Sequence, residues 1–187
     1  MSKLVVISGP SGVGKGTIVK LLEERYEKEG KKLYLSISCT TRNPREGERN
    51  GVDYYFITEE EFRKRIQNDD FFEYNEYSTG KFYGTPKSTV IEYLNKGFDV
   101  ILEIDINGYR KIKEIYPDCL GIFIMPPNEE ALYERLRNRK TESEEVIETR
   151  IKTSREEIAN SDIYDEIIVN ETGKSDVSAD IIYNLLN

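Results

Sequence analysis

The chain has 187 residues, with 35 acidic against 27 basic side chains, no histidine, no tryptophan and two cysteines. This length suits one domain with a core, or a core domain with insertions, and the lack of histidine excludes a Ser-His-Asp triad, a Cys-His pair and histidine-ligated zinc. A net charge of −8 argues against a bulk nucleic-acid or membrane binder, because both need a cationic face, but it permits a local cationic site.

Apolar segments suited to targeting or membrane insertion are not expected in this chain. The first apolar run, 4–7, ends at a Gly-Pro pair, and the longest uncharged apolar stretch, 119–127, contains glycine and proline. Both are too short for a signal-peptide core or a membrane-spanning helix. Cys39 and Cys119 have no metal-ligand spacing, so we expect reduced thiols and a cytoplasmic protein.

Strands and helices are expected to alternate along most of the chain. Short apolar runs predict strands over residues 4–7, 33–38, 99–104, 119–125 and 166–169. Apolar spacing and capping residues predict helices over residues 17–29, 128–139 and 176–186. This alternation predicts an α/β fold with a parallel, doubly wound sheet flanked by helices.

The segment 39–95 interrupts the alternation and predicts a small mixed α/β insertion. Aromatic-rich strands are expected over 52–57 and 71–77, with a short helix between them that begins at a capping box after Thr58. The domain division expected from these patterns places the core in residues 1–38 and 96–187.

Two further segments carry local expectations. Gly80 and Gly84 should bracket a turn, and Thr85 and Pro86 should be the cap and first residue of a following helix. The segment 135–157 is rich in both charge signs and has no long apolar run, so we expect a mobile, charged flap between two helices.

The segment between the first strand and the first helix has the composition of a phosphate-binding loop. It contains the Gly-x4-Gly-Lys pattern, whose glycines let backbone N–H groups point at phosphate oxygens while Lys15 adds a full charge. The alternative is a glycine-rich helix entry without a ligand. The predicted ATP-binding residues are Gly9, Pro10, Ser11, Gly12, Val13, Gly14, Lys15, Gly16 and Thr17.

The position after Lys15 departs from the common form of this motif. Gly16 stands where a Ser or Thr usually ligates Mg²⁺, and Thr17 follows one place later. We therefore expect no direct protein ligand to the metal. Mg²⁺ would be carried by ATP, with phosphate and water oxygens as its ligands.

Charged residues further along the chain suggest a site for a phosphate acceptor. Arg42 and Arg45 lie on a loop just after a strand, and forked guanidinium groups suit a dianionic phosphate. Asp105 follows a buried strand, at the edge where ligands of α/β folds bind. Alternatives remain open: the arginines could pair with Glu46 and Glu48, and the nearby tyrosines could be core residues.

Together, these motifs resemble the guanylate kinase family over nearly the whole chain, from about 5 to 170. The segments that carry the resemblance are 9–17, 38–45, 51–56, 72–73, 83–85, 103–108, 135–139 and 168–170. The resemblance implies a P-loop kinase fold with a GMP-binding insertion and a helical lid over about 135–157. Two departures are Lys140, where family members often carry Gly, and Asn107, where they often carry Gln.

The resemblance also implies individual roles. The residues implied to hold the phosphate of GMP are Arg42, Arg45, Tyr54 and Tyr83, and those implied to read guanine are Ser38, Glu73, Thr85 and Asp105. The implied catalytic residues are Lys15, Arg42, Arg135, Arg139 and Arg150, with Asn170 near the donor adenine. Carboxylates suit guanine, because its pairing edge offers N–H donors where adenine presents an acceptor.

The expected activity is therefore ATP-dependent phosphorylation of GMP, and of dGMP, by in-line transfer with domain closure. The expected partners are the two small-molecule substrates, with no nucleic acid and no membrane, and the sequence leaves monomer or homodimer open. Two alternatives are an inactive, guanylate-kinase-like binding scaffold and a kinase of the same fold for another nucleotide or a sugar phosphate.

Overall fold

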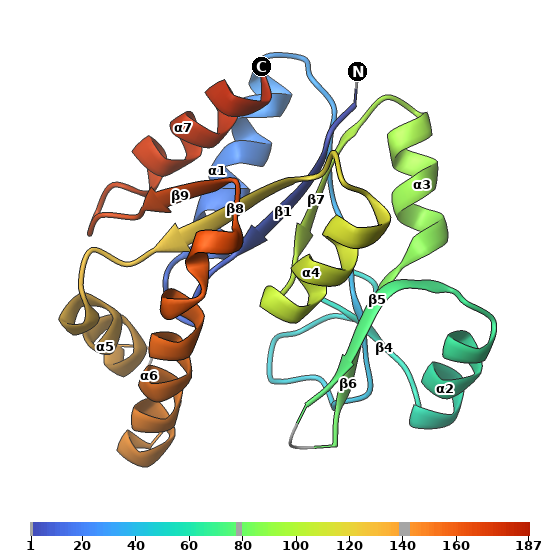
Figure 1. Ribbon diagram of the computed structural model, residues 1–187, viewed down its shortest axis with the longest axis horizontal. Coiled ribbons are helices and arrows are strands. Elements are labelled where there is room, and N and C mark those ends of the chain that lie inside the picture. Colours follow the sequence, from blue (N-terminus) through green and yellow to red (C-terminus); the bar gives the residue numbers. More distant parts are fainter. Residues whose placement is uncertain (1, 78–79, 139–142) are drawn as a thin grey trace. The chain divides into compact units, whose positions relative to one another are not determined.

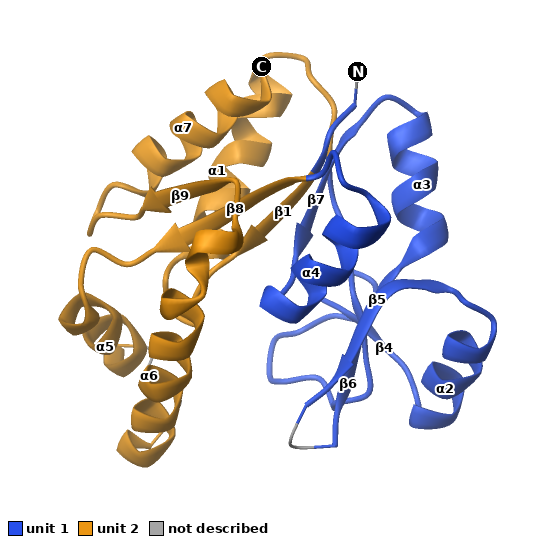
Figure 2. Ribbon diagram, viewed as in Figure 1, with its two compact units in different colours: residues 1–4, 34–119 blue, residues 5–33, 120–187 orange. Residues whose placement is uncertain are grey.

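The computed structural model describes residues 2–77, 80–138 and 143–187, and the chain divides into two compact units (Figures 1 and 2). Unit 1 comprises residues 1–4 and 34–119, and unit 2 comprises residues 5–33 and 120–187. The segment 39–95 lies wholly within unit 1. The expected division into core and insertion stays a prediction.

Unit 2 is built on a parallel sheet in the order β1-β8-β9. Its strands are β1 (Leu4–Ser8), β8 (Leu120–Met125) and β9 (Glu166–Val169). Its helices are α1 (Lys15–Lys28), α5 (Glu129–Asn138), α6 (Glu144–Ala159), the short 3₁₀ helix Ser161–Ile163 and α7 (Ser175–Leu186). Every residue of β1 is buried, as expected of an apolar parallel strand covered on both faces.

Helices α1 and α7 pack against each other in unit 2 (Figure 1). The rings of Tyr26 and Tyr183 meet edge to face with centroids 5.4 Å apart, and Arg25 pairs with Asp180. This packing gives α1, the helix that follows the predicted phosphate loop, a firm support. No helix in the described parts of the chain is long and apolar enough to cross a membrane.

Unit 1 contains a separate four-stranded sheet in the order β4-β3-β6-β5. Its strands are β3 (Cys39–Thr40), β4 (Tyr55–Phe56), β5 (Phe71–Glu76) and β6 (Phe82–Pro86). One face packs on α2 (Glu59–Gln67), where Cys39, Phe62, Phe71 and Phe82 form a buried cluster. The remaining elements of this part are β2 (Leu33–Leu35), α3 (Lys87–Asn95), β7 (Asp99–Glu103) and α4 (Ile106–Ile115).

The expected strands and helices are mostly confirmed, with shifted ends. The capping box is confirmed, because the Thr58 hydroxyl accepts a hydrogen bond from the Glu61 backbone N–H at 3.1 Å. The strand expected over 52–57 is only two residues long, and β3, β6 and α4 were not expected at all.

The helix start expected at Thr85 and Pro86 is wrong. Both residues belong to β6, and α3 begins at Lys87. Thr85 is opposite Glu73 in the antiparallel ladder, so its side chain belongs to a sheet face and does not cap a helix. Gly84 likewise lies inside the strand and does not bracket a turn with Gly80.

The expectation of a flap between two helices over 135–157 is wrong for the described residues. Helices α5 and α6 run through most of the segment. In each, two buried apolar residues lie one turn apart, Leu132 with Leu136 and Ile147 with Ile151. This spacing is enough to hold an amphipathic helix against its unit, even where no apolar run exists.

The first prediction concerns the aromatic cluster of unit 1. Phe62 is fully buried, with ring centroids 4.5 Å from Phe71 and 5.2 Å from Phe82. Phe62→Ala should lower the free energy of unfolding by about 3–5 kcal/mol, because it removes a large buried side chain and leaves a cavity. Urea denaturation measures this change. The control Ile115→Ala, at a 56% exposed position, should change the value by less than about 0.5 kcal/mol, and an equal loss in both variants would contradict the assignment.

Candidate functional site

The predicted phosphate loop joins β1 to α1 and has the backbone that its glycines permit. Gly9, Gly12 and Gly14 all have positive φ angles, of 142°, 87° and 104°. A Cβ atom at Gly9 would lie 2.4 Å from the carbonyl oxygen of Ile124, so no other residue fits there. The first N–H groups of α1 have no partner within the helix, and this end of a helix attracts anions.

Lys15 is the first residue of α1 and reaches back over the loop. Its Nζ donates hydrogen bonds to the carbonyl oxygens of Gly9 at 2.6 Å and Pro10 at 3.2 Å. These neutral acceptors fix the ammonium group without cancelling its charge. The arrangement places a held cation at the mouth of an anion-binding helix terminus, as a phosphate site requires.

Asn170 is a buried residue that contacts the phosphate loop. It is 2% exposed, its side-chain amide donates to the Val13 carbonyl oxygen at 2.8 Å, and it accepts a hydrogen bond from the Ser178 hydroxyl at 3.2 Å. A Cβ atom at Gly14 would lie 2.6 Å from the Asn170 amide nitrogen. Asn170 therefore contacts the loop itself, and its predicted place near an adenine stays a prediction.

Two of the three predicted lid arginines contact the same loop. Arg135, on α5, donates to the carbonyl oxygens of Val13 at 3.0 Å and Asn170 at 2.9 Å. Arg150, on α6, donates to the Ser11 hydroxyl at 2.6 Å. Lys15, Arg135 and Arg150 thus gather around one loop of unit 2. Arg139 and Lys140 lie outside the described residues.

In unit 1, three of the predicted guanine-reading and phosphate-holding residues share one face of the four-stranded sheet. Glu73 and Asn75 lie on β5, opposite Thr85 and Tyr83 on β6. Side chains two residues apart on a strand point to the same side, so these four form one polar patch. The opposite face carries the aromatic cluster against α2. Alternation therefore separates the polar face of this sheet from its core.

Glu73 is a buried carboxylate with few partners. It is 6% exposed, and its Oε1 accepts a hydrogen bond from the Thr85 hydroxyl at 2.7 Å. Burial raises the pKa of Glu73 to about 7, against the opposing effect of the Thr85 hydrogen bond, and nearby Asp105 raises it further. A carboxylate held at this cost beside a polar patch is a candidate acceptor for ligand N–H groups.

Asp105 joins this patch from the connection between β7 and α4. It caps α4 by accepting from the Gly108 N–H at 2.8 Å, and it also accepts from the Asn75 amide at 3.1 Å and the Tyr77 hydroxyl at 2.6 Å. Sequence reasoning missed Asn75 and Tyr77. The signal was the period of two that runs from Glu73 to Asn75 on β5 and to Tyr77 directly after the strand.

Arg42 is held beside the two tyrosines predicted to bind phosphate. Its guanidinium carbon lies 5.0 Å from the Tyr54 ring centroid, and the Tyr54 and Tyr83 centroids are 5.9 Å apart. Both terminal nitrogens of Arg42 donate to Glu48, each at 2.6 Å, and this pairing raises the pKa of Arg42. The ion pair with Glu48, one of the alternatives left open by the sequence, is therefore present.

The other two predicted residues of unit 1 lie on the same loop or just before it. Arg45 has an exposed side chain, while its backbone N–H donates to Glu48 at 2.7 Å. Ser38 precedes β3, and its carbonyl oxygen accepts a hydrogen bond from the Tyr55 N–H at 2.9 Å. Sequence reasoning treated Glu48 only as a competing partner, because its residue type does not distinguish it from its exposed neighbour Glu46.

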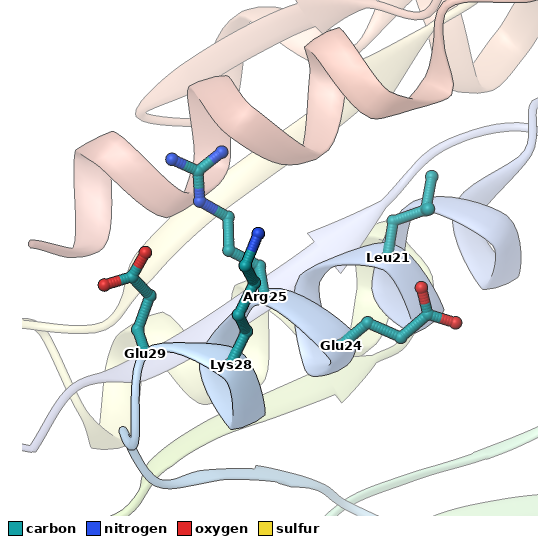
Figure 3. Close-up of a pocket in the computed structure, with 5 residues that line it drawn as sticks. All are labelled: Leu21, Glu24, Arg25, Lys28 and Glu29. Atoms are coloured by element: carbon teal, nitrogen blue, oxygen red, sulfur yellow. The ribbon is translucent and has the colours of Figure 1, made fainter.

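A surface pocket lies elsewhere in unit 2, along the outer side of α1 (Figure 3). It is lined by Leu21, Glu24, Arg25, Lys28 and Glu29. Arg25 already pairs with Asp180 of α7. None of the predicted site residues lines this pocket, so it is separate from the phosphate loop.

Comparisons with known proteins agree on one family. The guanylate kinase family model matches residues 1–179. A guanylate kinase of Prochlorococcus marinus subsp. pastoris is 48% identical over 170 residues, covering 91% of this chain and 90% of that protein. One from Carboxydothermus hydrogenoformans is 50% identical over 179 residues, covering 94% of this chain and 85% of that protein. The crystal structure of guanylate kinase from Anaplasma phagocytophilum matches with a TM-score of 0.75 at 35% identity, covering 99% of this chain and 84% of that one.

The second prediction follows from the raised pKa of Glu73. In the unfolded chain this carboxyl ionises near its ordinary pKa of 4.5, but in the folded chain it keeps its proton up to a pKa of about 7. The contribution of Glu73 to the free energy of unfolding is therefore greatest below pH 4.5 and is lost as the pH rises through about 7. The loss amounts to about 3 kcal/mol, the equivalent of the shift in pKa.

Glu73→Gln should remove this pH dependence while its amide oxygen still accepts from Thr85. The unfolding free energy of the variant, measured by urea denaturation between pH 5 and 8, should fall less with rising pH than that of the parent chain. Glu76→Gln, at an exposed position of the same strand, is the control and should follow the parent. Parallel profiles for the parent and Glu73→Gln would contradict the assigned pKa.

Proposed function

The chain belongs to the guanylate kinase family, and from this premise we propose that it transfers the γ-phosphoryl group of ATP to GMP, giving ADP and GDP. The observation that carries the choice of acceptor is the buried Glu73 carboxylate, bonded to Thr85 on the polar face of unit 1. Its free lone pairs suit the N1–H and N2 amino donors of guanine. Adenine would place a ring acceptor there instead and leave a buried carboxylate unsatisfied. We propose dGMP as a second acceptor.

Unit 2 is the proposed site of the donor. The β- and γ-phosphates of ATP would bind the N–H groups of the loop, with Lys15 and the start of α1 supplying positive charge. Arg135 and Arg150 contact this loop through Val13 and Ser11, so both are placed to meet charge that develops on the transferring group. Arg139 completes the proposed set.

Unit 1 is the proposed site of the acceptor. Arg42, Arg45, Tyr54 and Tyr83 would bind the GMP phosphate, and Ser38, Glu73, Thr85 and Asp105 would read the base. The nucleophile is a phosphate oxygen that is already anionic at neutral pH, so no general base is needed. Catalysis then rests on positioning and charge stabilisation. In-line transfer requires the two substrate phosphates to meet and water to be excluded, so the proposal includes domain closure during turnover.

The proposal treats MgATP as the donor substrate. Gly16 has no side chain to offer the ion, and among the described residues no group of three or more His, Cys, Asp or Glu side chains could hold a metal. We propose that the ion arrives with the phosphates of ATP, and that the enzyme works in the cytoplasm.

The third prediction tests the activity directly. ADP release with MgATP should be fast with GMP and far slower with AMP, UMP or ribose 5-phosphate. Glu73→Gln should lower kcat/KM for GMP on the order of 10²-fold to 10⁴-fold, because a ligand donor then faces an amide N–H, while ATP affinity is kept. Glu76→Gln serves as the control. No turnover with GMP by the parent chain would refute the proposal and favour a binding scaffold.

The fourth prediction concerns the metal. Gly16 has an ordinary helical backbone, and nothing lies within 4 Å of a Cβ atom built on it, so Gly16→Ser should fold normally. Its hydroxyl would occupy the position of the usual magnesium ligand of a phosphate loop. Titration of the ADP complex with Mn²⁺, followed by electron paramagnetic resonance, should show severalfold tighter metal binding. Gly16→Ala adds only the Cβ and should bind as the parent does; equal tightening in both would exclude direct ligation.

A further inference from the structure

Glu48 makes three contacts through one carboxylate. Its Oε2 accepts from Arg42 Nη1 at 2.6 Å and from the Arg45 backbone N–H at 2.7 Å, and its Oε1 accepts from Arg42 Nη2 at 2.6 Å. The Glu48 N–H also donates to the Arg45 carbonyl oxygen at 3.1 Å, which closes a tight turn. One side chain thus connects the two arginines that the proposed function assigns to the acceptor phosphate.

This ion pair differs from the exposed pairs elsewhere on the chain. The side chains of Arg42 and Glu48 are only 13% and 19% exposed, and the pairing is bidentate. The pair Arg63–Glu59, by contrast, has both side chains more than half exposed. Exposed pairs of that kind add little, whereas a shielded, forked pair fixes geometry. Hydrogen bonding from Arg42 holds the pKa of Glu48 at about 2, so the carboxylate is ionised throughout the neutral range.

The pairing leaves part of the Arg42 fork for a ligand. A guanidinium group carries five N–H donors. Glu48 takes one from each terminal nitrogen, and the Asn43 carbonyl oxygen accepts another from Nη1 at 2.9 Å. Arg42 also hydrogen-bonds the side chain of Tyr83, which the proposed function assigns to the same phosphate. The rings of Tyr54 and Phe56 lie against the guanidinium at 5.0 and 5.5 Å, which restricts its rotation. The Arg42 guanidinium, held by these groups, can present only its remaining edge to a ligand.

A carboxylate next to a site for a dianion has an electrostatic cost. Its negative charge opposes the binding of phosphate, and removing it would by Coulomb's law alone improve GMP affinity. If Glu48 favours GMP binding, it must do so by fixing the orientation of the Arg42 guanidinium. An arginine on a loop has many rotamers, and its affinity for phosphate falls when the fork is not held in register.

We propose that Glu48 is a positioning residue of the acceptor site, which orients the Arg42 fork and the Arg45 backbone so that both arginines address one phosphate. The inference rests on the proposed function, since it concerns the phosphate of GMP. It predicts that loss of the Glu48 charge weakens GMP binding through its phosphate only. A carboxylate that competed with phosphate for Arg42 would have the opposite effect.

The test compares Glu48→Gln with Glu46→Gln, an exposed control that removes the same charge two residues away. Steady-state kinetics should show KM for GMP raised on the order of tenfold to a hundredfold in Glu48→Gln, as expected for lost charged hydrogen bonds. KM for ATP and the inhibition constant of guanosine, which lacks the phosphate, should stay unchanged. Glu46→Gln should match the parent in all four constants, kcat included.

A double-mutant cycle then assigns the effect to Arg42. Arg42→Lys removes the fork, so adding Glu48→Gln in that background should raise KM for GMP little further. Should Glu48→Gln fail to fold in a thermal melt, Glu48→Asp replaces it, because its shorter side chain cannot reach both arginines and should raise KM for GMP alone.

Four outcomes would overturn the inference. They are a lower KM for GMP, an unchanged KM for GMP, an equal loss of guanosine and GMP binding, and independent effects of the Glu48 and Arg42 substitutions. Failure of the proposed function is a separate result, because the parent chain itself would then not phosphorylate GMP.

Discussion

Both halves of the proposed site depend on cations whose positions are set by acceptors of the chain itself. In unit 2, Lys15 is bound by two loop carbonyls, and Arg135 is bound by the loop carbonyl of Val13 and the carbonyl of Asn170; these neutral acceptors leave the positive charge intact. In unit 1, Arg42 is bound by Glu48, which fixes the fork more firmly but lowers the local charge. The glycine backbone of the phosphate loop and the turn at Arg45 both make these contacts possible.

The proposed recognition of the base depends on a negatively charged group instead. Glu73 is buried at a cost that shows in its pKa of about 7, even though Thr85 donates a hydrogen bond to its Oε1. A guanine that donates N–H groups to this carboxylate would stabilise its ionised form. Part of the binding energy of guanine would therefore offset the cost of burying the ionised Glu73 carboxylate. A base without those donors could not offset this cost.

The sequence predicted those features that depend on local pattern. The phosphate loop follows from glycines and a lysine between a strand and a helix. The pairing of Glu73 with Thr85 did not follow from local pattern, because β6 was not expected and Thr85 was assigned to a helix start; only the family resemblance implied that both read the base. The sequence could not predict contacts that depend on how a loop closes. Glu46 and Glu48 are the same residue type two positions apart, yet only the turn at Arg45 determines which of them meets Arg42.

The charged segment 135–157 shows a related limit. Its composition alone predicted a charged flap, whereas the family resemblance implied a helical lid. The described part of the segment is mostly helical, because charge on the outer face of a helix is compatible with an inner face of only a few apolar residues. Arg135 and Arg150 therefore project from helices, which present a side chain more reproducibly than an irregular loop does. The contacts of both arginines with the phosphate loop agree with that role.

The absence of histidine and the net charge of −8 now have a common explanation. Transfer between two phosphates needs no base, because the attacking oxygen is already anionic, so the chemistry rests on fixed positive charge. In a chain with 35 acidic residues, any unrestrained arginine has many carboxylates within reach. The fold must therefore select the partner of each functional cation. Glu48 illustrates this selection, because one shielded carboxylate, bonded to the Arg45 backbone, occupies one side of Arg42, and the proposed phosphate of the substrate would bind the other.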